Sequence, residues 1–296
     1  MCIVITGNNL PSKTKIIQVP VTIDNVAYNC LMYINSFELD KSVLQNDYFT
    51  VGTFLENSFN NNIKDPSLLI IPIPIPKRSK LEFGFFDINN RKMQKMIYDM
   101  NTLRNVNTNI INNLDTTVLG NYKISITRSK EELLNRIDWN IFNKPHDFES
   151  RIKTLEDQNL FYPEYEWVFV ILVAEQNVMN NGFGIVYKSL DIDYFPISSS
   201  NKENFVIEKN SIYDHDLYHF SNNTGVDSKI GPLKSDSYTT KLNQTHINLL
   251  NTLSTIPIEF ERGIIKRMMI DSVKFCNYYK IKGVGKNKNV YLLKQN

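Results

Sequence analysis

The stretch Trp167-Val168-Phe169-Val170-Ile171-Leu172-Val173-Ala174 is apolar throughout and rich in β-branched and aromatic residues. A continuous apolar run of this length is typical of a strand that is buried on both faces. Turn residues follow at Asn180-Asn181-Gly182, and Phe183–Lys188 has the composition of an antiparallel partner strand. This region therefore predicts the centre of a sheet.

A second apolar run, Leu68–Ile71, also suits a buried strand, but prolines 72, 74 and 76 follow it in alternation. Because proline removes a backbone donor, the end of this run is expected to be an edge strand or a polyproline stretch. Shorter segments with strand-like composition occur along the whole chain: Ile3–Thr6, Lys15–Val21, Val26–Ile34, Leu81–Phe86, Asn121–Thr127, Phe205–Glu208, Leu217–Phe220, Tyr278–Lys282 and Val290–Leu293.

Helical spacing of apolar residues predicts helices at Asn90–Asn101 and Asn243–Leu253, and Phe148–Gln158 and Glu261–Val273 are two further helix candidates. A further helix is expected after Ser129, because Ser129 and Glu132 have the spacing of a capping box. The predicted fold class is α+β, with an antiparallel or mixed sheet core and several peripheral helices. We expect a strand-rich core domain over 1–240, with 101–120 as its candidate division. A basic helix–helix–hairpin segment follows over 241–296, within the same domain or beside it.

Composition limits the functional classes. The chain has 296 residues, 42% hydrophobic and 22% charged, which is ordinary for a globular protein. It has three cysteines at no metal-ligand spacing, no basic leader and no apolar run near the ~20 residues of a membrane span. We expect a soluble, intracellular protein without a membrane segment or a cofactor. Alanine occurs only at Ala27 and Ala174, a bias that an A/T-rich genome explains and that favours a large DNA virus as the source.

The densest polar cluster is Tyr213–His219, and it contains Asp214, His215 and His219. Imidazole and carboxylate groups together could bind a divalent metal or act as a catalytic base and its orienting group. The simpler interpretation is a strand end with satisfied polar groups. These three residues are the candidate catalytic and metal-binding residues.

Charge is uneven along the chain. From Arg262 onward there are nine Lys or Arg and a single acid, Asp271, and aromatic residues lie between the lysines. Phosphates could contact the lysines while bases stack on the rings, so Lys280, Lys282, Lys286 and Lys288 are candidate nucleic-acid-binding residues. A solvated amphipathic surface has the same pattern.

Several segments together resemble an uncharacterised protein family found in bacteria, protists and large DNA viruses. The resemblance covers about residues 68–220, and four segments carry it: Leu69–Pro74, Gly182–Lys188, Tyr194-Phe195-Pro196 and Tyr213–Tyr218. Its relatives place histidines after the aromatic-Pro segment, where this chain has Ile197-Ser198-Ser199-Ser200. The resemblance implies no activity, and the missing histidines weaken a metal-enzyme interpretation.

The motifs Gly-x-Ser-x-Gly, His-Glu-x-x-His and Cys-x-x-Cys are absent from the sequence. The leading hypothesis is a non-enzymatic binding or structural protein. If the source is viral, we expect this protein in the virion or in the host cytoplasm. The alternatives are a nucleic-acid-binding module that uses the basic C-terminal region, and a degenerate or metal-dependent hydrolase centred on Asp214, His215 and His219.

Overall fold

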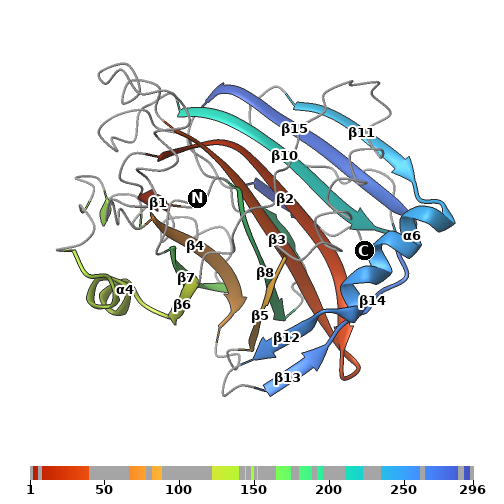
Figure 1. Ribbon diagram of the computed structural model, residues 1–296, viewed down its shortest axis with the longest axis horizontal. Coiled ribbons are helices and arrows are strands. Elements are labelled where there is room, and N and C mark those ends of the chain that lie inside the picture. The colour runs from red at the N-terminus through yellow and green to blue at the C-terminus, as the bar shows by residue number, and fades with distance from the viewer. Residues whose placement is uncertain are drawn as a thin grey trace, which may run out of the picture.

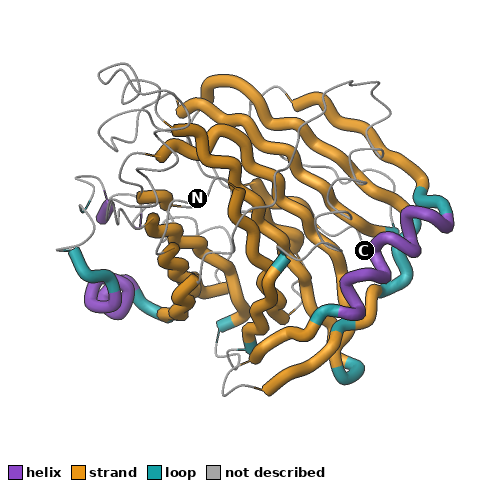
Figure 2. Tube along the Cα trace, viewed as in Figure 1, coloured by secondary structure: helices purple, strands orange, loops and turns teal. Residues whose placement is uncertain are grey.

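The structure is a computed structural model. It describes residues 3–5, 9–39, 67–77, 82–88, 122–139, 144, 148–149, 152, 165–174, 180–188, 192–195, 211–222, 235–260, 264–285 and 290–293. Strands make up most of these residues, and the helices are short (Figure 2). No described helix is long and apolar enough to cross a membrane.

A large sheet dominates the described residues. Its strand order is β11-β15-β10-β2-β3-β8-β5-β12-β13, and β14 pairs with β2 beside this path (Figure 1). The bounds are β2 Asn9–Ile23, β3 Val26–Leu39, β5 Phe83–Asp87, β8 Asn180–Lys188, β10 Ser211–Ser221, β11 Ser235–Lys241, β12 Pro257–Phe260, β13 Ile264–Arg267, β14 Met269–Ile270 and β15 Phe275–Gly285. The sheet is mixed, because β10 runs parallel to β2 while the other pairs are antiparallel.

The hairpin of β2 and β3 forms the middle of this sheet. Its two turn residues, Asp24 and Asn25, have φ angles of 50° and 62°. Positive φ at both positions is the conformation of the two-residue turn that matches strand twist, and Asp and Asn tolerate it better than most residues. The sequence therefore fixes the register of the two longest strands through this turn.

One face of the large sheet is covered by α6 (Gln244–Leu250) and the 3₁₀ turn η2 (Asn251–Thr255). Leu250 and Leu253 from these turns join a buried cluster with alternate residues of the strands, such as Ile17, Tyr218 and Tyr278. Asn243 caps α6 together with His246: each side chain accepts the other residue's backbone N–H.

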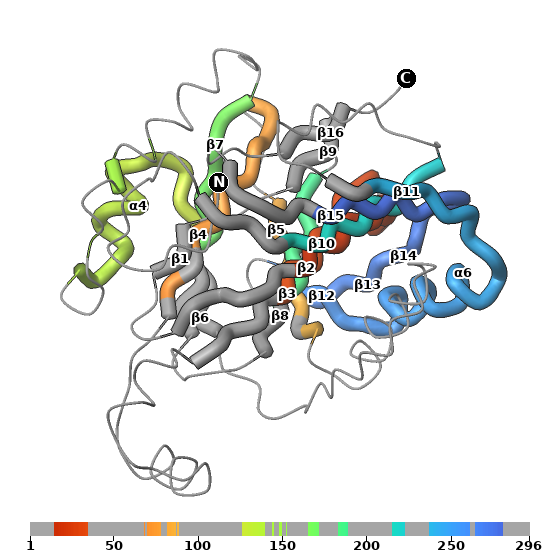
Figure 3. The backbone as a smooth tube through the Cα atoms, turned by 90° about the horizontal axis from the view of Figure 1, so that it is seen from above, coloured from red at the N-terminus to blue at the C-terminus, as the bar shows by residue number. Residues whose placement is uncertain are grey.

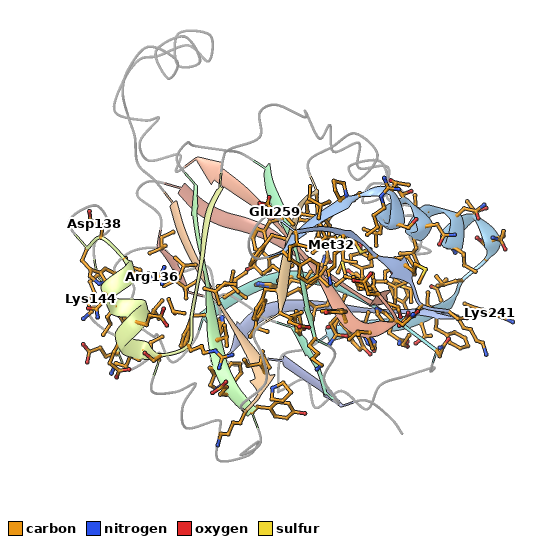
Figure 4. The ribbon with its side chains drawn as sticks, turned by 90° about the horizontal axis from the view of Figure 1, so that it is seen from below. Met32, Arg136, Asp138, Lys144, Lys241 and Glu259 are labelled. Carbon is orange, nitrogen blue, oxygen red and sulfur yellow. The ribbon has the colours of Figure 1, made fainter. Side chains whose placement is uncertain are left out.

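A smaller sheet has the order β1-β4-β7-β6, with β1 Ile3–Ile5, β4 Ser67–Pro76, β7 Tyr165–Ala174 and β6 Tyr122–Thr127. It lies to one side of the large sheet, and α4 (Lys130–Arg136) lies at its outer side (Figure 3). Figure 4 shows Arg136, Asp138 and Lys144 around this helix, at the opposite end of the molecule from Lys241. A core cluster joins the helix to the sheet through Leu133, Ile70, Trp167 and Phe169.

The prolines of β4 are accommodated on one edge. β4 pairs with β7 along its whole length, whereas its pairing with β1 ends at Ile70. Residues two apart in a strand direct their N–H groups to the same edge, so prolines 72, 74 and 76 remove donors only from the edge that β1 no longer covers. Within the described residues, the prediction of an edge at this end of the run is confirmed.

The predicted α+β class with several peripheral helices is wrong, because the described chain is predominantly β-sheet. The largest single error is Glu261–Val273, which contains β13 and β14 instead of a helix. Ile264 and Ile265 are β-branched, which favours a strand, and their pairing with β12 forms a strand here.

Other expectations gave mixed outcomes. The helix after Ser129 is confirmed as α4, where Ser129 Oγ accepts the N–H of Glu132 at 3.0 Å. The helix at Asn243–Leu253 is confirmed as α6 and η2. The two C-terminal strands exist but do not form the expected hairpin: β15 pairs with β10 and β11, and β16 (Val290–Leu293) pairs with β9 (Ile192–Phe195).

Of the helix predicted at Phe148–Gln158, the structure describes residues 148, 149 and 152, and these are helical. The predicted helix Asn90–Asn101, the candidate division at 101–120 and the strand Phe205–Glu208 lie outside the described residues. The division into 1–240 and 241–296 stays a prediction. Strand β15, from the second part, lies between β10 and β11 of the large sheet.

Candidate functional site

The predicted histidine site lies on β10, inside the large sheet. His215 and His219 are both buried and lie four residues apart on one face of the strand. That spacing separates them by about 13 Å along a strand, with Leu217 between them. Asp214 precedes His215 by one register position on the same strand. The strand thus sets the two histidines apart.

A polar row crosses four strands beside His219, and it is buried at Gln18, His219 and Asn277 and exposed at Thr239. Gln18 of β2, His219 of β10, Asn277 of β15 and Thr239 of β11 occupy matching register positions. Thr239 Oγ1 donates to Asn277 Oδ1 at 2.7 Å, and Asn277 Nδ2 donates to Ser221 Oγ at 3.1 Å. Because the buried Asn277 side chain has partners on two neighbouring strands, these bonds favour one strand register.

Burial also determines the protonation of His215. Loss of water lowers its pKa from 6.5 to about 3, and the neighbouring Asp216 carboxylate opposes this only in part. A neutral, buried imidazole is a poor proton shuttle at pH 7. Within the described ranges there is no group of three or more His, Cys, Asp or Glu that could hold a metal.

The candidate nucleic-acid-binding lysines are described only in part. Lys280 is half-buried on β15 and lies between two acidic register positions, Asp216 of β10 and Asp236 of β11. Lys282 lies opposite Asp214 in the same ladder. Lys286 and Lys288 lie outside the described residues. A lysine flanked by carboxylate positions contributes less to a phosphate-binding field than the sequence count suggests.

The exposed large apolar side chains of the described chain gather elsewhere, at one end of the large sheet. They are Ile264 and Ile265 of β13, 52% and 69% exposed, Met269 of β14, 56% exposed, and Val26 after the β2–β3 turn, 39% exposed. We call these four residues the edge patch. The turn of β2 and β3, β13 and β14 lie near one another in Figure 1.

An ion pair joins the parts of the edge patch. Lys266 Nζ lies 2.8 Å from Asp24 Oδ2 in the β2–β3 turn, and the same ammonium lies over the Phe260 ring, 5.2 Å from its centroid. The ion pair ties β13 to the β2–β3 hairpin, and the contact with Phe260 ties it to β12. The contacts of Lys266 therefore hold β13, and with it part of the edge patch, in a defined position.

Strand β13 ends the path of the described sheet and pairs with β12 on one side. Three of its four residues are exposed, and Ile264 and Ile265 belong to opposite faces. An outer strand presents backbone N–H and C=O groups to any chain that can lie beside it. Here the backbone of β13 lies between exposed apolar side chains. This combination of backbone groups and apolar side chains suits the binding of an extended peptide.

The opposite edge of the same sheet differs in composition. β11 has the sequence Ser-Asp-Ser-Tyr-Thr-Thr-Lys, and Lys241 at its end is exposed. Polar side chains and lysine on an edge oppose pairing with other chains. The two ends of the described sheet thus differ: the β11 end is polar, and the β13 end carries exposed apolar side chains.

Sequence reasoning missed the edge patch because it assigned this segment to a helix. A usable signal was present in the dipeptide Ile264-Ile265 beside Lys266-Arg267, four residues after the β-compatible run Pro257–Phe260. Two short β-rich runs with a few residues between them are typical of a hairpin.

Comparison with known proteins assigns no family. No family model matches the chain, and no curated protein matches it. The resemblance drawn from residues 68–220 therefore has no support from these two comparisons.

Solved structures of a baculovirus protein are similar to this chain over almost its whole length. The crystal structure of baculovirus P35 has 14% identity and a TM-score of 0.44, and the match covers 97% of each chain. A mutated baculovirus P35 after caspase cleavage has 16% identity and a TM-score of 0.40, covering 96% of this chain and 100% of that one. The caspase-8/P35 complex has 15% identity and a TM-score of 0.39, covering 96% of each. TM-scores below 0.5 describe a loose likeness, which assigns neither a family nor a function to this chain.

Proposed function

We propose that this chain is a non-enzymatic protein-binding protein and that the β13 edge with its edge patch is the contact surface. One observation carries the proposal: the exposed large apolar side chains of the described chain gather at β13, which has no second pairing strand among the described residues. Exposed apolar groups that gather at one place, unlike scattered ones, are typical of interaction sites.

The positions of four described histidines and cysteines support the same proposal. His215 and His219 are buried within the sheet, and the thiols of Cys30 and Cys276 are buried too. Burial raises the pKa of Cys276 to about 12 and also raises the pKa of Cys30, so both thiols stay protonated. A buried, protonated thiol is unreactive as a nucleophile.

The test is a selection of random peptides displayed on a carrier. The full chain and the variant Ile264→Thr/Ile265→Thr are used in parallel, because threonine preserves strand propensity while it removes apolar surface. We expect peptides that are enriched on the wild-type chain and lost on the variant. The control, Lys241→Thr on the opposite edge, should retain them.

An equal peptide yield from the wild-type chain and the edge variant would overturn the proposal. Both variants should unfold at the wild-type temperature, since substitutions of exposed residues change stability by about 0.5 kcal/mol or less. In the virion form of the proposal, the partner is a particle protein, and the chain should be stoichiometric in purified particles. Absence from such particles would remove that form while leaving the binding proposal in place.

A further inference from the structure

We infer that the partner of the β13 edge is an extended segment of another protein, which adds to the sheet as an antiparallel strand and carries two acidic residues followed by two apolar ones. The inference rests on the proposed function and specifies the chemistry of the partner.

The backbone provides the first step. β13 pairs with β12, and β12 pairs with β5, both in antiparallel register. A segment that continues this series adds main-chain hydrogen bonds, which supply affinity without regard to sequence. Antiparallel pairs are about two to three times as common as parallel ones. A helix could not satisfy the outward N–H and C=O groups of β13, so the partner segment is extended.

The side chains of β13 provide the second step. From its start the strand has two apolar residues, Ile264 and Ile265, and then two basic residues, Lys266 and Arg267. An antiparallel partner meets these four positions in reverse order, so its first two residues lie opposite the cations and its next two opposite the isoleucines. Opposite charges and apolar pairs directly across two strands are favourable.

The two cations differ in availability. Lys266 is already held by Asp24 at 2.8 Å. Arg267 is exposed and has no ion-pair partner among the residues that the structure describes. Arginine also binds carboxylates through two parallel hydrogen bonds. Arg267 is therefore the main specificity residue, and the partner's first acidic residue lies opposite it.

Charge also argues against a second copy of this chain as the partner. Antiparallel pairing of two β13 strands would place Arg267 opposite Ile264 of the second copy and Lys266 opposite Ile265. Each cation would then lie opposite an isoleucine, and four cations would share one short ladder without an acid from either β13, so the favourable opposite-charge pairs would be missing.

The test uses synthetic eight-residue peptides whose central four residues are two glutamates and two valines, with threonines on both sides. Binding to the full chain is measured by fluorescence anisotropy at low ionic strength. The acidic peptide should bind about tenfold more tightly than a peptide with two lysines in place of the glutamates. Its affinity should fall as salt rises, because the pairs are exposed.

Two further variants locate the site. Arg267→Glu should exchange the preference, so that the lysine peptide becomes the tighter ligand. Lys241→Glu makes the same change of sign at the opposite edge of the sheet and should leave the preference unchanged. Exchange of the preference by Lys241→Glu would overturn the assignment to β13.

Methylation of backbone amides tests strand addition directly. Two peptides are made, each methylated at alternate amides, in complementary sets. In a strand, one set of amides is directed toward β13 and the other away from it, so one peptide should lose binding and the other retain it. Equal behaviour of the two peptides would overturn strand addition.

The outcomes separate this inference from the proposed function. No binding of the acidic peptide at about 1 mM, which corresponds to a weak −4 kcal/mol, would overturn the inference. If the peptide selection still gave ligands lost in Ile264→Thr/Ile265→Thr, the proposed function would stand with a partner of different chemistry.

Discussion

The ring of Phe86 on β5 lies over Gly184, the residue directly opposite it on β8. The next strand pair repeats the arrangement, because the ring of Phe260 on β12 lies over Gly84, its direct partner on β5. An aromatic ring that covers a cross-strand glycine replaces the packing that the missing side chain would give. The two pairs pack β5 against β8 and β12 against β5, next to the strand that carries part of the edge patch.

Gly184→Ala should therefore destabilise the fold, because the new methyl group would collide with the Phe86 ring. We expect a loss of about 1–3 kcal/mol in the free energy of unfolding, measured with urea. In a Phe86→Leu background the same substitution should cost clearly less, since the ring is gone. A cost that is identical in both backgrounds would contradict the contact.

The polar row predicts that Asn277 contributes to stability through its hydrogen bonds. Asn277→Leu keeps the side-chain volume but removes the acceptor for Thr239 and the donor to Ser221. We expect a loss of about 1–3 kcal/mol in urea unfolding. The exposed Asn248 on α6 is the matched control, and Asn248→Leu should change stability by about 0.5 kcal/mol or less. If the two substitutions lowered the free energy of unfolding equally, the hydrogen bonds of the polar row would have no special role in stability.

Individual strands could be predicted from the sequence, but their arrangement could not. Trp167–Ala174 and Leu68–Ile71 are recognisable because buried strands are continuously apolar. Their assignment to the smaller sheet depends on pairing partners distant in sequence, such as Ile3 with Ile70. Composition carries no signal for such pairing.

The candidate site was missed for a related reason. Two isoleucines followed by two basic residues suit a helix face and an edge strand equally well. Only the pairing of β13 with β12 decides between them, and only the sheet order shows that β13 is an edge. The sequence predicted a site at the histidines because they lie in its densest polar cluster. Their burial follows from a parallel pairing of β10 with β2 that no local pattern indicates.

The ion pair of Asp24 and Lys266 should have a small role in stability and a measurable one in binding. Asp24 and Lys266 are both solvent-accessible, so Asp24→Asn should cost about 1 kcal/mol or less in unfolding. Asparagine also tolerates the positive φ of this position. The substitution frees Lys266 and removes a negative charge beside the edge, so the acidic peptide should bind about two- to fivefold more tightly at low salt.

Fluorescence anisotropy of the same peptides provides the measurement for Asp24→Asn. Asn25→Asp, one position along the turn, adds a negative charge and should act in the opposite direction. If Asp24→Asn bound the acidic peptide more weakly than wild type, Lys266 would contribute to peptide binding only while Asp24 holds it in place.

His215 should make the stability of the protein depend on pH in the acid range. Its pKa is near 6.5 when it is unfolded and exposed, and burial lowers it to about 3 in the fold. Between these values the unfolded chain binds a proton that the folded chain excludes, so stability falls as pH falls below 6.5. From pH 6.5 to 4.5 the loss from this group is on the order of 2–3 kcal/mol.

The variant His215→Gln cannot titrate, so its stability should fall less over that range. We expect the variant to be less stable than wild type at pH 7.5, since glutamine must fit the buried position, and the difference to shrink as pH falls. The control is His246→Gln: His246 is only partly buried, and glutamine can preserve the capping box of α6. Urea unfolding of the three proteins at several pH values measures the slopes. If wild type and His215→Gln lost stability in parallel, His215 would be exposed or protonated in the fold, contrary to its place in the sheet.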